Sequence, residues 1–146
     1  MNNIKIDKFI PGGQSIGALP SGKKAMLWGA LPGELITEYE VTKEKSTYLE
    51  AIAVKISQSS PHRVAPLDDC YLATSPWQIL DYNYELESKH ELLLEIFRQQ
   101  KIPLDDVKIA EVQTDNRDFY YRNKMEYALY YDHADQQIHL AFRARG

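Results

Sequence analysis

The sequence predicts an all-β, OB-like barrel followed by a partial α+β domain with one long helix and an antiparallel sheet. Three observations support this fold class. Short alternating segments separated by glycine and proline occupy the first 60 residues. One long stretch of helical period follows, and the end of the sequence returns to period-two alternation. We therefore expect a barrel over 1–60, a linker over 61–80 and an incomplete α+β domain over 81–146.

The barrel is predicted from strands at 4–10, 24–28, 34–41 and 47–56. Turns at Pro11-Gly12-Gly13 and Pro20-Ser21-Gly22 separate them, because proline presets one dihedral and glycine admits positive φ. The doubled glycine could instead form a phosphate nest, but neither a Lys-Ser ending nor a helix follows it. We therefore interpret it as a turn.

A helix is predicted over 81–101, with Asp81 as its N-cap and Pro103 beyond its end. Its apolar stripe consists of Leu86, Leu93, Leu94 and Phe97. An acidic ridge at four-residue spacing is formed by Glu87, Glu91 and Glu95. Such a ridge would repel phosphate, so we expect it to face away from any nucleic acid. A strand at 107–113 and a loop at 114–118 follow.

The segment 119–146 predicts a hairpin, because two alternating runs flank a short polar turn. Joining the apolar faces pairs Leu129 with Ile138, Tyr127 with Leu140, and Met125 with Phe142. A slip of one residue would turn one apolar row to solvent.

The same register places Lys124 opposite Arg143 and Arg122 opposite Arg145. Like charges directly opposite on a sheet are unfavourable, so the pattern favours an anion between them, carried by a phosphate-bearing partner. The alternative is four solvated side chains on a surface screened by salt.

Composition limits the class of protein. Hydrophobic content is 44% and the net charge is −4, and no apolar run reaches membrane-spanning length, so no membrane partner is expected. Residues 63–108 hold 5 Lys/Arg against 9 Asp/Glu, so any nucleic-acid contact must be a local patch. The N-terminus lacks the apolar core of a signal peptide, and one cysteine excludes an internal disulfide. We expect a cytoplasmic protein.

The sequence shows no complete catalytic or metal site. The histidines show no metal-ligand spacing with one another or with Cys70, and the adjacent Asp68 and Asp69 are expected to point apart in a loop. No nucleophile-base set and no glycine-rich strand-to-helix turn appears. We therefore predict no catalytic residue and no metal ligand.

Cations beside aromatic residues are the clearest chemical signal, because such pairs hold phosphate while stacking bases. Lys43, Lys45 and Tyr48 cluster at a predicted hairpin tip, with Lys23-Lys24 at a neighbouring strand entry. Phe119, Tyr120 and Tyr121 precede Arg122. Each of these three aromatics could equally be part of the core.

Several segments, taken in order, carry a family resemblance. They are Gly12–Gly17, Ala30-Leu31-Pro32-Gly33-Glu34, Pro61-His62-Arg63-Val64, Trp77–Tyr82 with Leu86 and Lys89, Tyr121-Arg122-Asn123-Lys124, and Phe142-Arg143. In this order the chain resembles the N-terminal half of the class I, S-adenosylmethionine-dependent RNA 5-methyluridine (uracil-C5) methyltransferases. The barrel resembles their TRAM domain.

The resemblance implies that S-adenosylmethionine, the catalytic cysteine and the general base belong to a C-terminal Rossmann-like domain. This sequence stops before that domain and is not expected to methylate alone. Many family members hold an iron–sulfur cluster on four cysteines. Here that place reads Leu72-Ala73-Thr74-Ser75 with Cys70 alone nearby, which does not support a cluster.

We therefore expect an RNA-binding, non-catalytic region that takes structured rRNA or tRNA. The expected contacts are Lys23, Lys43, Lys45, Tyr48, Tyr121, Arg122, Asn123, Lys124, Arg143 and Arg145. The alternatives are a protein–protein adaptor that uses the acidic ridge and exposed tyrosines, and a subunit of a split enzyme. A catalytic methyltransferase domain, in cis or in trans, is a possible partner.

Overall fold

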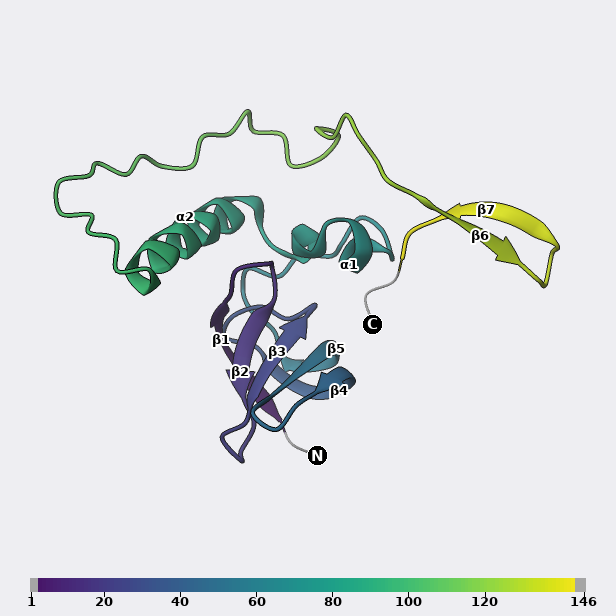
Figure 1. Cartoon of the computed structure of the whole chain (residues 1–146), viewed down its shortest axis with the longest axis horizontal. Helices are drawn as coiled ribbons and strands as arrows, with labels where there is room; N and C mark the ends of the chain where they lie inside the picture. Colours follow the sequence, from purple (N-terminus) through teal and green to yellow (C-terminus); the bar gives the residue numbers. More distant parts are fainter. Residues whose placement is uncertain (1–2, 144–146) are drawn as a thin grey trace.

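The computed structural model describes residues 3–143 and begins with a closed barrel of five strands. These are β1 (Ile4–Phe9), β2 (Ser15–Ala18), β3 (Lys24–Trp28), β4 (Leu35–Glu44) and β5 (Tyr48–Gln58). The barrel order is β1-β2-β3-β5-β4, and β1 closes on β4 (Figure 1). The β3–β5 pair is parallel and the other neighbours are antiparallel, so the OB-like barrel is confirmed.

Small residues let the barrel close. The interior is filled by aliphatic side chains, namely Ile4, Ile6, Leu19, Ala25, Leu27, Ala30, Ile36, Leu49 and Ala51. At Gly17 a Cβ atom would lie 2.2 Å from the Lys5 carbonyl oxygen, so β2 can approach β1 only with glycine there. The sequence analysis missed β2, because four residues interrupted by glycine give little alternation.

The segment after β5 packs against one end of the barrel. It contains α1 (Tyr71–Thr74) and a 3-10 turn, η1 (Pro76–Ile79). Ile79 and Leu80 join Phe9 and Leu31 in a second buried cluster. The Trp77 indole N–H donates to the Gly13 carbonyl at 2.9 Å, and its ring lies 4.6 Å from that of Phe9. The Gly12-Gly13 turn is confirmed, with φ of 101° and 94°.

A buried ion pair ties the same segment to the barrel. The Glu34 carboxylate is fully buried and accepts two hydrogen bonds from the Arg63 guanidinium, at 2.6 and 2.7 Å. Arg63 also donates to the Gly29 carbonyl at 2.8 Å. The amides of Leu31 and Ser60 donate to the same carboxylate, so its lone pairs are well satisfied.

The long helix α2 (Tyr82–Gln99) is confirmed, with its predicted N-cap. The Asp81 carboxylate accepts from the Tyr84 amide at 3.1 Å, and Pro103 lies beyond the helix end. Figure 1 shows α2 lying across one end of the barrel. None of the helices among the described residues is long and apolar enough to cross a membrane.

The predicted acidic ridge contacts the barrel at one of its residues, which the sequence did not indicate. The Glu95 carboxylate accepts from the Lys8 ammonium of β1 at 2.8 Å. Residues next to Glu95 on α2, Arg98 and Gln99, also donate to it. Glu87 and Glu91 remain exposed.

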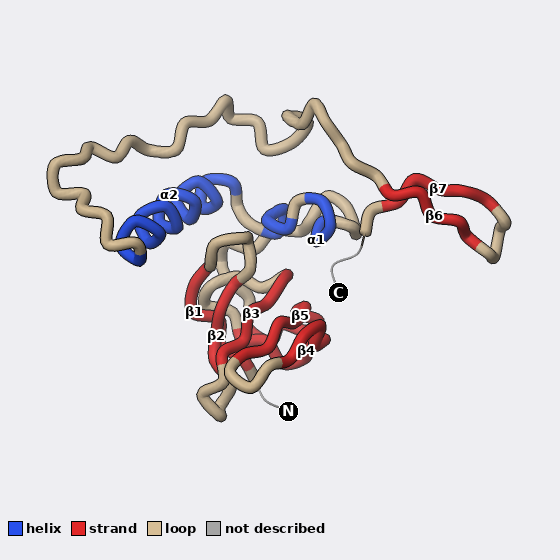
Figure 2. The backbone as a smooth tube through the Cα atoms, viewed as in Figure 1, coloured by secondary structure: helices blue, strands red, loops and turns tan. Residues whose placement is uncertain are grey.

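The chain then runs through a long irregular segment to a separate two-stranded sheet (Figure 2). The strand predicted at 107–113 is wrong: no pairing forms there within the described range 3–143. The hairpin itself is confirmed as β6 (Ala128–Asp132) and β7 (Gln137–Ala141).

The hairpin register differs from the prediction by two residues, since Leu129 pairs with Leu140 and Tyr131 with Ile138. A two-residue shift keeps every side chain on its face, so alternation could not distinguish the two registers. Turn chemistry decides between them. The Asp132 carboxylate accepts from the Ala134 amide at 2.8 Å, and Gln136 takes a left-handed φ of 60°, which closes a tight turn over residues 133–136.

Candidate nucleic-acid interface

Four predicted RNA contacts meet at one end of the barrel, and we call Lys23, Lys43, Lys45 and Tyr48 the barrel-tip patch. The β4–β5 hairpin turns here, where the Lys45 amide donates to the Tyr48 carbonyl at 2.9 Å. The parallel β3–β5 pairing places Lys24 opposite Tyr48, and Lys23 is the residue before Lys24. The fold therefore assembles residues 25 apart in the sequence into one surface.

Glutamates partner two of the lysines in the barrel-tip patch. Lys23 lies 2.6 Å from Glu44, and Lys43 lies 3.0 Å from Glu50. The hydrogen bond with Glu50 holds the pKa of Lys43 above its usual value. The Lys43 ammonium also lies 5.9 Å from the centre of the Tyr48 ring. Exposed ion pairs contribute only about 0–1 kcal/mol, so a phosphate can replace these carboxylates.

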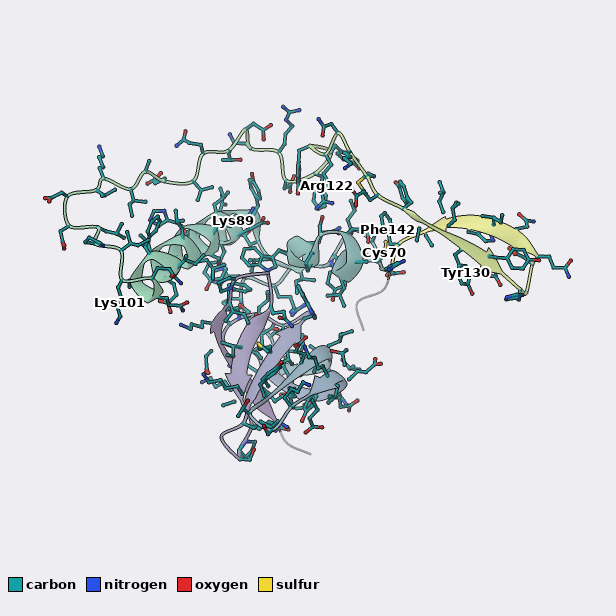
Figure 3. All side chains as sticks on the ribbon, viewed as in Figure 1. Cys70, Lys89, Lys101, Arg122, Tyr130 and Phe142 are labelled. Carbon is teal, nitrogen blue, oxygen red and sulfur yellow. The ribbon has the colours of Figure 1, made fainter. Side chains whose placement is uncertain are left out.

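The base of the β6–β7 hairpin carries the second predicted set, and we call Tyr121, Arg122, Asn123 and Lys124 the hairpin-base patch. Arg122 and Lys124 line a cavity of about 290 Å³ with Thr74 and Phe142. The Arg122 guanidinium donates to the Thr74 carbonyl at 3.1 Å, which joins this patch to α1. Cys70, Arg122 and Phe142, labelled in Figure 3, all line one larger groove in this region.

The predicted pairing of Lys124 with Arg143 is wrong, and the predicted pairing of Arg122 with Arg145 lies outside the described residues. Described strand pairing ends at Ala128 and Ala141, so Arg122 and Lys124 lie outside the ladder. Lys124 instead pairs with Glu126 at 2.9 Å. Arg143 is exposed. Arg145 lies outside the described residues.

A larger groove of about 1310 Å³ runs beside the hairpin-base patch, between the segment 64–82 with α2 and the segment 112–122. Its lining includes Trp77, Lys89, Arg117 and Tyr121, which combine cations with aromatic rings. The Tyr82 hydroxyl hydrogen-bonds Thr114 across it. Arg117 and Tyr82 were not predicted as contacts. The sequence shows a cation and an aromatic residue at these positions, but it does not show that the two segments lie on the same groove.

Tyr120, next to this groove, has an unusual backbone. Its φ is 59°, in the left-handed region that bulky residues rarely adopt, and its side chain is 94% exposed. Its ring lies 6.4 Å from that of Phe119 and is largely open to solvent, so it is available to stack on a ligand.

Metal-binding capacity among the described residues is limited to Asp132, Asp135 and His139, whose ligand atoms lie within 4.8 Å of one another at the exposed hairpin turn. Local structure already uses them: Asp135 accepts from the Gln137 amide at 2.9 Å and contacts His139 at 2.8 Å. Cys70 is a free, exposed thiol, and the neighbouring Asp68 raises its pKa.

Comparison with curated proteins found relatives that are RNA methyltransferases. The chain is 27% identical over 136 residues to an uncharacterized RNA methyltransferase of Thermotoga maritima, covering 87% of this chain and 28% of that protein. It is 30% identical over 134 residues to the 23S rRNA (uracil(1939)-C(5))-methyltransferase RlmD of Shewanella amazonensis, covering 86% and 28%. An uncharacterized RNA methyltransferase of Aquifex aeolicus is 31% identical over 132 residues, covering 86% and 29%.

The chain thus spans less than a third of the length of these relatives. No protein-family model matches it.

Proposed function

Because the chain is homologous to the N-terminal portion of RNA (uracil-C5) methyltransferases, we propose that it is the RNA-binding, non-catalytic part of such an enzyme. Its substrate would be structured rRNA or tRNA. The relative from Shewanella is a 23S rRNA methyltransferase, which favours rRNA. The observation that carries the proposal is the OB-like barrel with four cationic or aromatic residues gathered around its β4–β5 turn.

The position of the barrel-tip patch supports RNA contact. OB-folds bind oligonucleotides with the face of strands 2–3 and with the loops between strands 1 and 2 and between strands 4 and 5. Here the β1–β2 loop is engaged by the Trp77 indole, which donates to Gly13. The β4–β5 turn, with Lys43 and Lys45, is exposed. RNA would therefore meet the barrel at the barrel-tip patch.

The hairpin-base patch would supply a second contact. Arg122 and Lys124 line a cavity, and Tyr121 and Arg117 line the adjoining groove. An arginine can hold a phosphate by two hydrogen bonds while an aromatic ring stacks a base. Arg143, exposed near Phe142, extends this proposed surface.

Catalysis is assigned elsewhere in this proposal. S-adenosylmethionine and the groups that methylate uracil would belong to a catalytic domain supplied in cis or in trans. Cys70 is a single cysteine where four would hold an iron–sulfur cluster. The adaptor alternative relied on the acidic ridge and on exposed tyrosines. The tyrosines are exposed, but the ridge is weakened as a partner surface, because Glu95 is paired with Lys8.

Titration of a labelled 23S rRNA stem-loop tests the proposal at low salt. We expect Lys43→Ala/Lys45→Ala and Arg122→Ala/Lys124→Ala each to weaken binding roughly tenfold, because each removes phosphate contacts. Lys55→Ala is the matched control, since Lys55 lies toward the opposite end of β5 from Tyr48 and is similarly exposed. Equal affinity for parent and both double variants would refute the assignment.

A further inference from the structure

The β6–β7 hairpin presents one apolar face that is largely exposed within the described chain. Cross-strand pairs place on it Leu129 with Leu140 and Tyr131 with Ile138. The rings of Tyr127 and Phe142, 5.0 Å apart, continue the same face toward the hairpin base. Leu129, Ile138 and Leu140 are 76%, 69% and 68% exposed. We call these six residues the hairpin apolar face.

This exposure is costly for an isolated sheet. A two-stranded hairpin is at best marginally stable in water and needs a third strand or a helix against its apolar side. Within the described residues β6 and β7 pair only with each other, so both outer edges are open as well. Covering these side chains would remove apolar surface from water, which favours association. Contiguous apolar surface of this kind usually marks an interaction site.

The chemistry of the face favours a polypeptide over RNA. Its six residues carry no charge, whereas binding a nucleic-acid backbone requires cations. The cations of the proposed RNA surface lie instead at the barrel tip and the hairpin base.

We infer that the hairpin apolar face is the docking surface for the polypeptide that follows the matching portion in the relatives, whether it is supplied in the same chain or by a separate one. We choose this occupant because the match covers only 28% of each relative, so most of the polypeptide in those proteins lies outside the matching portion. The inference rests on the proposed function. A strand could add to the open edge of β6 or β7 while apolar side chains cover the face.

The test is co-expression of this chain, tagged, with the untagged remainder of the Aquifex aeolicus relative, followed by affinity purification and light scattering. We expect a 1:1 complex with the parent. Leu129→Glu/Leu140→Lys should reduce the recovered partner roughly tenfold or more. This variant keeps an opposite-charge pair across the strands, so the hairpin can still form. The control is Tyr130→Glu/His139→Lys, a directly opposed pair on the other face, which should retain the partner.

Failure to recover the partner with the parent, including a remainder that stays insoluble, would overturn the inference. Equal recovery of the partner with both variants would overturn it too. A homodimer of the parent chain that Leu129→Glu/Leu140→Lys dissociates would also overturn it, because a second copy of the chain would then cover the face. The same samples are titrated with the rRNA stem-loop. If the parent chain binds the partner but not RNA, the proposed function alone is contradicted. If it binds RNA but not the partner, the inference of a docking surface alone is contradicted.

Discussion

Glu34 and Arg63 lie 29 residues apart and form a buried, bidentate pair. The two residues were visible as parts of separate motifs, but alternation and spacing gave no sign that they meet. Both motifs therefore serve the fold: they fasten the segment after β5 to the barrel. Trp77 has a similar role through the Gly13 carbonyl.

Removing one partner of this pair should be severe. Arg63→Ala would leave the Glu34 carboxylate buried without its counter-charge, and we expect a loss of about 3–5 kcal/mol in the free energy of unfolding. Denaturant unfolding followed by tryptophan fluorescence measures it. Arg98→Ala is the control, because Arg98 is an exposed arginine with carboxylate partners and should change stability by less than about 1 kcal/mol. Similar losses for both variants would show that the buried pair contributes little.

At the scale of elements, the long helix was predictable because its period, N-cap and terminating proline agree. The way it packs was not, since nothing in the sequence indicated that Glu95 of the acidic ridge pairs with Lys8 of β1. The hairpin shows the same limit: alternation defined its faces, but the turn that sets the register depends on Asp132 and on the left-handed Gln136.

The contact between α2 and β1 should be pH-dependent. The hydrogen bond from Lys8 holds the pKa of Glu95 below its ordinary value of 4.5. A depressed pKa in the folded state gives stability that is present above the unfolded-state pKa and is lost as pH falls through the folded-state pKa. The difference in unfolding free energy between parent and Glu95→Gln should therefore be present at neutral pH and disappear in the acid range below 4.5.

Lys8→Gln provides the control for this prediction. In that background the Glu95→Gln difference should shrink and its pH dependence should weaken, because the largest cause of the pKa shift is gone. An unchanged pH profile would mean that Lys8 does not stabilise the ionised carboxylate.

At the scale of the whole molecule, the barrel, the helix and the hairpin followed from the sequence, because each element has a local pattern. Which residues of different elements lie close together could not be predicted from the sequence. Lys23 and Tyr48 come together only through the parallel β3–β5 pairing, and Arg122 reaches α1 only through the long irregular segment. The predicted strand at 107–113 failed for a related reason: alternation suggests a strand, but a strand needs a neighbour to pair with.

The most direct test of RNA binding through two separate cationic patches is the salt dependence of affinity. Each phosphate contact to single-stranded RNA should add about 0.7 to the slope of log affinity against log salt concentration, and somewhat more in duplex regions. We predict a steep slope for the parent and a slope lower by roughly 3 for Lys43→Ala/Lys45→Ala/Arg122→Ala/Lys124→Ala. A parent that does not bind the rRNA stem-loop at low salt, or a quadruple variant with the parent's slope, would contradict the account.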